Sequence, residues 1–162
     1  MTTVNSVETV SPNTTQSLPS WARIVADVRP YLTGHAHWLL RATLASVFIH
    51  HGVLKLANLE GNAEMLQLPI STVLLVALAE AVGGALVLSG GFSKVTPAAA
   101  WLTRLGALML VPVMAGAIVM VHWGQWNFVP SQTHPMGGME FQVVLLLLSL
   151  YFVVTGTKPR AA

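Results

Sequence analysis

Residues 38–57 read WLLRATLASVFIHHGVLKLA, a run of 20 residues that is apolar apart from a few polar and ionisable side chains. An α-helix needs about 20 predominantly apolar residues to cross the hydrocarbon core of a bilayer. Three further apolar stretches follow at about 69–90, 98–122 and 139–157. The breaks between them contain Pro, Gly, Asn and charged residues, which interrupt helices. The sequence therefore predicts an all-α integral membrane protein, a bundle of four transmembrane helices.

The composition excludes several other classes of protein. Apolar residues make up 54% of the chain and charged residues 9%, whereas a soluble domain carries roughly a quarter of charged residues. The net charge of +2 comes without a Lys/Arg cluster, so we expect no nucleic-acid partner. There is no cysteine, which excludes a thiol redox couple and a thiolate metal site in this chain. Redox chemistry would need a cofactor or a partner.

The chain begins with a polar segment and a short amphipathic one. Residues 1–20 lack the apolar run of a signal peptide, and we expect them to form a disordered tail. Residues 21–34 are predicted to form a helix in the membrane interface, with an arm packed on its own bundle as the alternative. The apolar residues that recur there at helical spacing are Trp21, Ile24, Val25, Val28 and Leu32.

The distribution of Lys and Arg predicts the orientation in the membrane. With four alternating spans, Lys55 falls on one side and the other cationic residues fall on the opposite side, namely Arg23, Arg29, Arg41, Lys94, Arg104, Lys158 and Arg160. The side rich in Lys and Arg is cytoplasmic, so both termini are expected there. The third loop has no Lys or Arg but contains Trp123, Trp126 and Phe128, which suits an outer loop at the membrane interface.

Ionisable residues within the spans are the candidate functional residues, because each costs about 2.5 kcal/mol or more to insert and so needs a partner or a role. With a rise of about 1.5 Å per residue, His50 and His51 lie about 18 to 20 Å above the cytoplasmic end, and Glu80 about 15 Å. Lys55 and Glu140 both come out at about 26 Å. The sequence thus predicts that polar groups from all four spans converge on one site in the outer half of the bundle. Of the two adjacent histidines, His51 is the expected partner of Glu80, because it shares a helix face with Lys55.

Each of these residues also has a purely structural interpretation. Glu80 with a histidine partner would fix the register of two helices. Lys55 with Glu140 would form a structural ion pair near the interface. His122, at the end of the third span, would be an interfacial residue beside Trp123. No two metal ligands have the helical spacing of a metal motif within a span, so no metal site is predicted.

Several short motifs resemble those of the DoxX family. The first span contains Leu40–Arg41 and the run His50–Leu56, which is similar to the family's Leu-Arg and His-Gly-x-x-Lys. Ala79–Gly84 is similar to its Glu-x-x-Gly-Gly, and Gly137–Glu140 to its Gly-Gly-x-Glu. His122 stands where members often have a histidine. The resemblance covers about residues 38–157, and the N-terminal tail and arm depart from it.

The resemblance implies a four-helix domain at 38–157 in the inner (plasma) membrane. Some members are subunits of quinone-linked oxidoreductases, such as the thiosulfate:quinone type, and others are associated with membrane-bound oxidative-stress complexes. Two hypotheses follow. In the first, the chain is the membrane subunit of a redox system: it binds a quinone with His50, Lys55, His122 and Glu140, while Glu80 and His51 supply protons.

In the second hypothesis, the chain is a membrane anchor or assembly subunit of a larger complex, and its polar residues only hold four helices together. The sequence has no metal motif and no nucleotide-binding loop, so we expect neither cofactor. Other protein subunits are expected under both hypotheses, because the chain cannot form a complete electron pathway alone. Whether it is itself an enzyme stays open.

Overall fold

The computed structural model describes residues 19–92 and 97–157 of the chain. Within these ranges the secondary structure is entirely helical, as predicted, and contains no strand. The elements in chain order are α1 (Ser20–Ala57), α2 (Leu59–Leu66), α3 (Ile70–Phe92), α4 (Pro97–Ala117), the π-helix η1 (Ile118–His122) and α5 (Glu140–Thr155). Of the tail expected at residues 1–20, residues 1–18 lie outside the described part of the chain.

Within residues 19–92 and 97–157, three segments are long and apolar enough to cross a membrane: His35–Ala57, Ile70–Phe92 and Ala98–His122. They match the first three predicted spans to within a few residues. The fourth predicted segment is also helical, but α5 is a shorter apolar helix, Glu140–Thr155. The chain is therefore an all-helical protein with at least three candidate membrane spans.

Helix α1 is longer than predicted. Residues 21–34 and 38–57 were expected to form separate helices, whereas the structure has one run of helix from Ser20 to Ala57 with Pro30 inside it. Residues up to Ala36 and residues from His37 onward belong to two different compact units, and we describe each by itself. In the first unit, the apolar side chains of the predicted amphipathic face are exposed to 42–66%.

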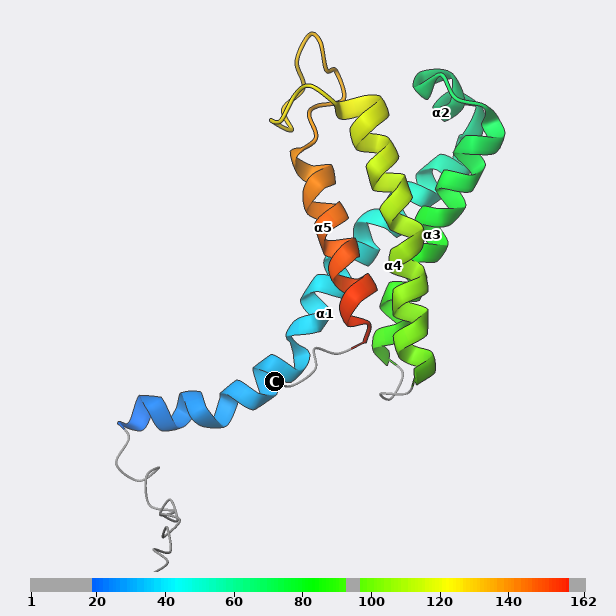
Figure 1. Cartoon of the computed structure of the whole chain (residues 1–162). Helices are drawn as coiled ribbons and strands as arrows, with labels where there is room; N and C mark the ends of the chain where they lie inside the picture. Colours follow the sequence, from blue (N-terminus) through cyan, green and yellow to red (C-terminus); the bar gives the residue numbers. More distant parts are fainter. Residues whose placement is uncertain (1–18, 93–96, 158–162) are drawn as a thin grey trace, which may run out of the picture. The chain divides into compact units, whose positions relative to one another are not determined.

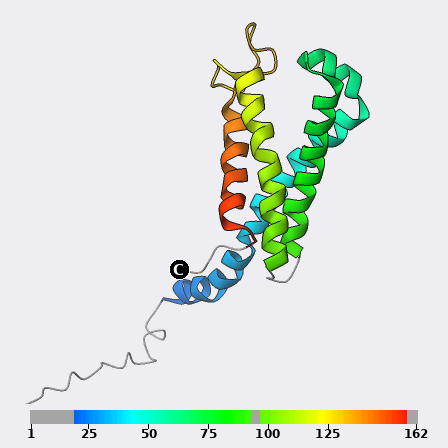
Figure 2. The same ribbon diagram turned by 45° about the vertical axis from the view of Figure 1, so that its right-hand side comes forward.

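In the second unit, α3, α4 and α5 run side by side, with α4 packed against both of its neighbours (Figures 1 and 2). Helix α1 crosses α3 at an angle in both views. Helix α2 and the loop that follows η1 lie at the same end of the bundle. A core of Leu44, Phe48, Val87, Ala107, Leu110, Met114, Leu145 and Phe152 joins the long helices.

Two adjacent glycines of α3 allow its close contacts on either side. A Cβ at Gly83 would lie 2.8 Å from the Leu110 side chain and 3.0 Å from the Gly106 carbonyl of α4. A Cβ at Gly84 would lie 3.3 Å from the backbone nitrogen of Ile49 in α1. Small residues let helix backbones approach in this way in membrane bundles. The Gly-Gly pair therefore places α3 between α1 and α4.

Candidate functional site

The point where α1 crosses α3 brings two opposite charges together. At Gly52 a Cβ would lie 2.6 Å from the backbone nitrogen of Ala81 and 2.8 Å from the carbonyl oxygen of Ala77. The two backbones are thus almost in contact one turn below Lys55. Lys55 Nζ lies 2.6 Å from Glu80 Oε2 and 2.9 Å from Oε1. The Glu80 side chain is 4% exposed and that of Lys55 18%, so this is a largely buried ion pair.

The pairing of Lys55 with Glu140, expected from their equal heights, is wrong. Glu140 begins α5, and its Oε2 accepts a 3.4 Å hydrogen bond from the backbone N–H of Phe128 in the preceding loop. The height calculation treats every helix as perpendicular to the membrane. Helix α1 instead crosses α3 at an angle (Figure 1), so that Lys55 reaches a carboxylate assigned to a different depth.

His122 is a buried residue at the end of the π-helix, 6% exposed. Its Nδ1 lies 2.8 Å from the carbonyl oxygen of Gly137, and its Nε2 lies 3.0 Å from Nε2 of Gln142 in α5. A π-turn adds a residue to the helical turn and redirects the side chains that follow. Because both ring nitrogens have partners, the imidazole is held at a single orientation between α4 and α5.

One cavity of about 650 Å³ is lined both by the Lys55–Glu80 ion pair and by the hydrogen-bonded side chains of His122 and Gln142. Its walls are mostly apolar and come from α1, α2, α3, α4, η1 and α5. The ionisable and amide side chains in its lining include His51, Lys55, Glu80, His122 and Gln142. Four of the proposed residues thus line one cavity, and two amide side chains, Asn62 and Gln142, are additional.

Methionine forms an unexpected part of the cavity wall. Of the seven methionines in the chain, four line this cavity: Met65, Met114, Met120 and Met136. The thioether is polarizable and makes favourable contacts with aromatic rings. The cavity wall thus offers several polarizable thioether groups.

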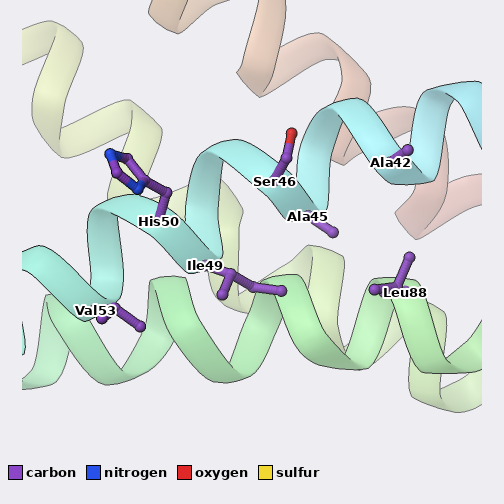
Figure 3. A pocket seen from close by; sticks show the side chains of 7 residues that line it. All are labelled: Ala42, Ala45, Ser46, Ile49, His50, Val53 and Leu88. Carbon is purple, nitrogen blue, oxygen red and sulfur yellow. The ribbon is translucent and has the colours of Figure 1, made fainter.

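The two adjacent histidines of α1 face different surroundings. His51 lines the cavity with Glu80, but the described hydrogen bonds of Glu80 go to Lys55. The rings of His50 and His51 have centroids 5.7 Å apart and are nearly perpendicular. His50 lies in a separate groove beside Ser46, Ile49 and Val53 (Figure 3). Neither His50 nor Glu140 belongs to the cavity lining.

Arg41 is a buried cation that the sequence analysis used for orientation and for the family resemblance but not as a candidate site residue. It is fully buried. Its Nη1 donates to the Val87 carbonyl and, at 3.0 Å, to Thr103 Oγ1, and its Nη2 donates at 3.2 Å to the carbonyl oxygens of Gly156 and Thr157. The guanidinium also lies 4.9 Å from the centre of the Phe152 ring. It connects α1 to α3, α4 and the end of α5.

Taken together, the fold and the cavity describe a helical protein with candidate membrane spans and a mostly apolar cavity that has a few polar side chains in its lining. The DoxX family profile matches residues 36–123, more than half of the chain, and the chain belongs to the DoxX family. The matched segment contains Lys55, Glu80 and His122, whereas Gln142 and the rest of α5 lie beyond it.

A curated relative comes from Bacillus subtilis (strain 168). The chain is 28% identical to this protein, "Putative oxidoreductase CatD", over 123 residues, which are 74% of this chain and 78% of the relative. No solved structure matches the chain. Among the described residues, no group of three or more His, Asp or Glu side chains is arranged to hold a metal ion.

Proposed function

We propose that the chain is the membrane subunit of a redox system and binds a quinone, or a similar redox lipid, in the cavity between its helices. Membership of the DoxX family and the name of the Bacillus relative support a role in membrane redox chemistry. The chain has no cysteine and therefore no thiol couple of its own. A bound quinone would supply two-electron redox chemistry instead. The chain provides the site, and the electrons come from a partner subunit.

The observation that carries this proposal is the cavity itself. Small-molecule sites are typically mostly apolar, about 300 to 1,000 Å³ in volume, with a few placed polar groups. This cavity has about 650 Å³, methionine in its walls and polar groups from α1, α3, η1 and α5. Its buried Gln142 Oε1 has no hydrogen-bond partner in the described chain, and because an amide oxygen accepts, the hydroxyl of a reduced quinone ring fits the residues present.

The proposed roles follow from position. Glu80 and His51 lie on facing helices and exchange protons with the bound ring, and Lys55 holds the Glu80 carboxylate in place. His122 bonds to the Gly137 carbonyl and to the Gln142 amide and so orients that amide, and Gln142 accepts a hydrogen bond from a ring hydroxyl at another part of the wall. His50 and Glu140, which were candidates from the sequence, lie outside the cavity lining and have no direct role in this proposal.

The proposal includes four spans in the inner membrane with both termini in the cytoplasm. Helix α5 packs along α4, and a span of α4 would carry α5 into the bilayer with it. The exposed apolar face of residues 21–34 supports an interfacial helix. Seven of eight Lys and Arg residues lie on the side assigned to the cytoplasm, which supports the orientation.

The lipid extract of the purified protein tests the proposal. Protein isolated from its native membrane in mild detergent should carry about one quinone per chain, seen in the ultraviolet spectrum and by mass spectrometry. A sample without quinone that retains a co-purifying protein would contradict the redox role.

A sample without quinone but with a bound partner protein would favour the alternative function, an anchor or assembly subunit. One observation supports this alternative. Both oxygens of Glu80 are bonded to Lys55, and such a pair can serve only to fix the register of α1 on α3. Under this alternative, the partner protein should remain bound when the cavity is filled by a larger side chain.

A further inference from the structure

The hydrogen bonds of His122 determine which of its nitrogens carries the proton. Nδ1 faces the carbonyl oxygen of Gly137 at 2.8 Å, and a carbonyl oxygen can only accept a hydrogen bond. Nδ1 is therefore the donor. In a neutral imidazole the other nitrogen, Nε2, is then an acceptor.

This assignment determines how the side-chain amide of Gln142 is turned. Nε2 of His122 lies 3.0 Å from Nε2 of Gln142. Because the imidazole nitrogen accepts, Gln142 presents its NH₂ group to it. The carbonyl end, Oε1, is left as the free end of the amide, and this buried oxygen has no hydrogen-bond partner in the described chain. A buried acceptor without a donor costs about 1 to 3 kcal/mol.

The charged groups that face the cavity do not supply that donor. Lys55 and Glu80 are bonded to each other. His51, in the lining from α1, lies edge-on to His50 and makes no hydrogen bond to Gln142 Oε1, which has no partner in the described chain. Glu140, two residues before Gln142, is directed to the N–H of Phe128. In contrast to Glu80, whose two oxygens are both occupied, Gln142 offers an unused acceptor.

We infer that Gln142 determines which form of the ring the cavity prefers: its Oε1 accepts a hydrogen bond from a ring hydroxyl, so the site favours a hydroxylated aromatic ring over one without that donor. The inference rests on the proposed function, because it concerns a ring bound in the same cavity. The reduced, hydroxylated form of a quinone has such a donor, and the oxidised form has carbonyl oxygens that do not. Because Oε1 is itself buried, this bond requires the amide to turn toward the ring.

A pair of redox-inactive probes tests the inference: an alkylphenol and its methyl ether, which share a ring but differ in the donor. Binding to the purified full-length protein is measured by calorimetry at about pH 8, where an imidazole is neutral. The variants are Gln142→Met, which removes the acceptor, and Gln132→Met, a matched change in the exposed outer loop. The wild type should bind the phenol about tenfold to a hundredfold more tightly than the ether.

In Gln142→Met the two probes should bind within about twofold of one another, while Gln132→Met should keep the wild-type preference. Equal binding of phenol and ether by the wild type would overturn the inference and leave the proposed function standing. A preference that persists in Gln142→Met would also overturn it. If neither probe nor a short-chain quinone binds the wild type, the proposed function itself fails. The wild-type comparison decides the matter even if Gln142→Met does not fold.

Discussion

Lys55 places a positive charge among apolar side chains, and Glu80 neutralises it at 2.6 Å. In such surroundings, removal of one partner leaves the other charge buried and uncompensated, which typically costs more than the pair contributes. Replacement of both charges avoids that cost. The pair should therefore behave as one unit in a mutational test.

We expect Lys55→Met to lower the free energy of unfolding by about 3 kcal/mol, and the double variant Lys55→Met/Glu80→Gln to recover part of that loss. Unfolding in detergent, followed by circular dichroism, measures both. Glu140→Gln is a matched control, because its single 3.4 Å bond lies at the loop, and it should cost less than about 1 kcal/mol. Strictly additive losses for Lys55 and Glu80 would show that the two do not interact.

Single residues also show where sequence reasoning reached its limit. The helical rise gave heights for Lys55 and Glu140 but not the angle at which α1 crosses α3. The predicted partner of Lys55 was therefore Glu140, whereas the structure pairs Lys55 with Glu80. His122 and Glu80 were found because an ionisable residue in an apolar span stands out. Gln142 was missed because an uncharged amide within an apolar span is less unusual than a charged side chain. Arg41 was not proposed as a site residue because it lies near the end of a span, where cations are common.

At the scale of an element, the crossing of α1 and α3 depends on one missing side chain. A Cβ at Gly52 would meet backbone atoms of α3 at 2.6 and 2.8 Å, and backbone cannot move aside as a flexible side chain can. Gly116 in α4 is the opposite case, since a Cβ there would meet nothing within 4 Å. The two glycines therefore form a matched pair for a test of helix packing.

Gly52→Ala should destabilise the protein by about 1 to 3 kcal/mol, because the crossing must open and Lys55 must move away from Glu80. Gly116→Ala should be neutral or stabilise by up to about 1 kcal/mol, since alanine favours the helix. Thermal melting in detergent compares the two directly. A Gly52→Ala protein as stable as wild type would mean that α1 does not approach α3 this closely.

The positions of the helices were well predicted from the sequence, because long apolar segments bounded by Pro and Gly carry a strong signal. Helix α2 was not foreseen: residues 58–69 were taken as a break, yet Asn58 caps a short helix by accepting a hydrogen bond from the N–H of Gly61 at 3.1 Å. The π-turn at η1 was also missed. Its effect depends on packing around His122, which periodicity does not reveal.

At the scale of the whole molecule, the orientation in the membrane decides which side the cavity faces. The loop that follows η1 presents Trp123, Trp126 and Phe128, each more than half exposed, and aromatic residues of this kind gather at membrane interfaces. Helix α2 lies at the same end of the bundle as this loop (Figure 2). The cavity, lined from α2 to α5, is therefore in the outer half of the proposed topology.

Reporter fusions test that topology. A reporter joined after Arg160 should be active only in the cytoplasm, and one inserted near Gly61 or Gln132 only outside, because Lys and Arg are strongly biased to one side. An outside location for the C-terminal reporter would contradict either the four spans or their direction.

The central claim, that the cavity holds a quinone, is tested most directly by filling the cavity. Gly116 lines it and has free space around it, so Gly116→Leu should occupy the cavity without a clash, while Gly116→Ala should change its volume little. The measurement is the quinone content per chain of the wild type and both variants, purified in parallel, with total lipid as the reference. The account predicts about one quinone per chain in the wild type and Gly116→Ala, and at least a tenfold loss in Gly116→Leu at an unchanged melting temperature. Equal quinone in all three proteins, in proportion to total lipid, would contradict it.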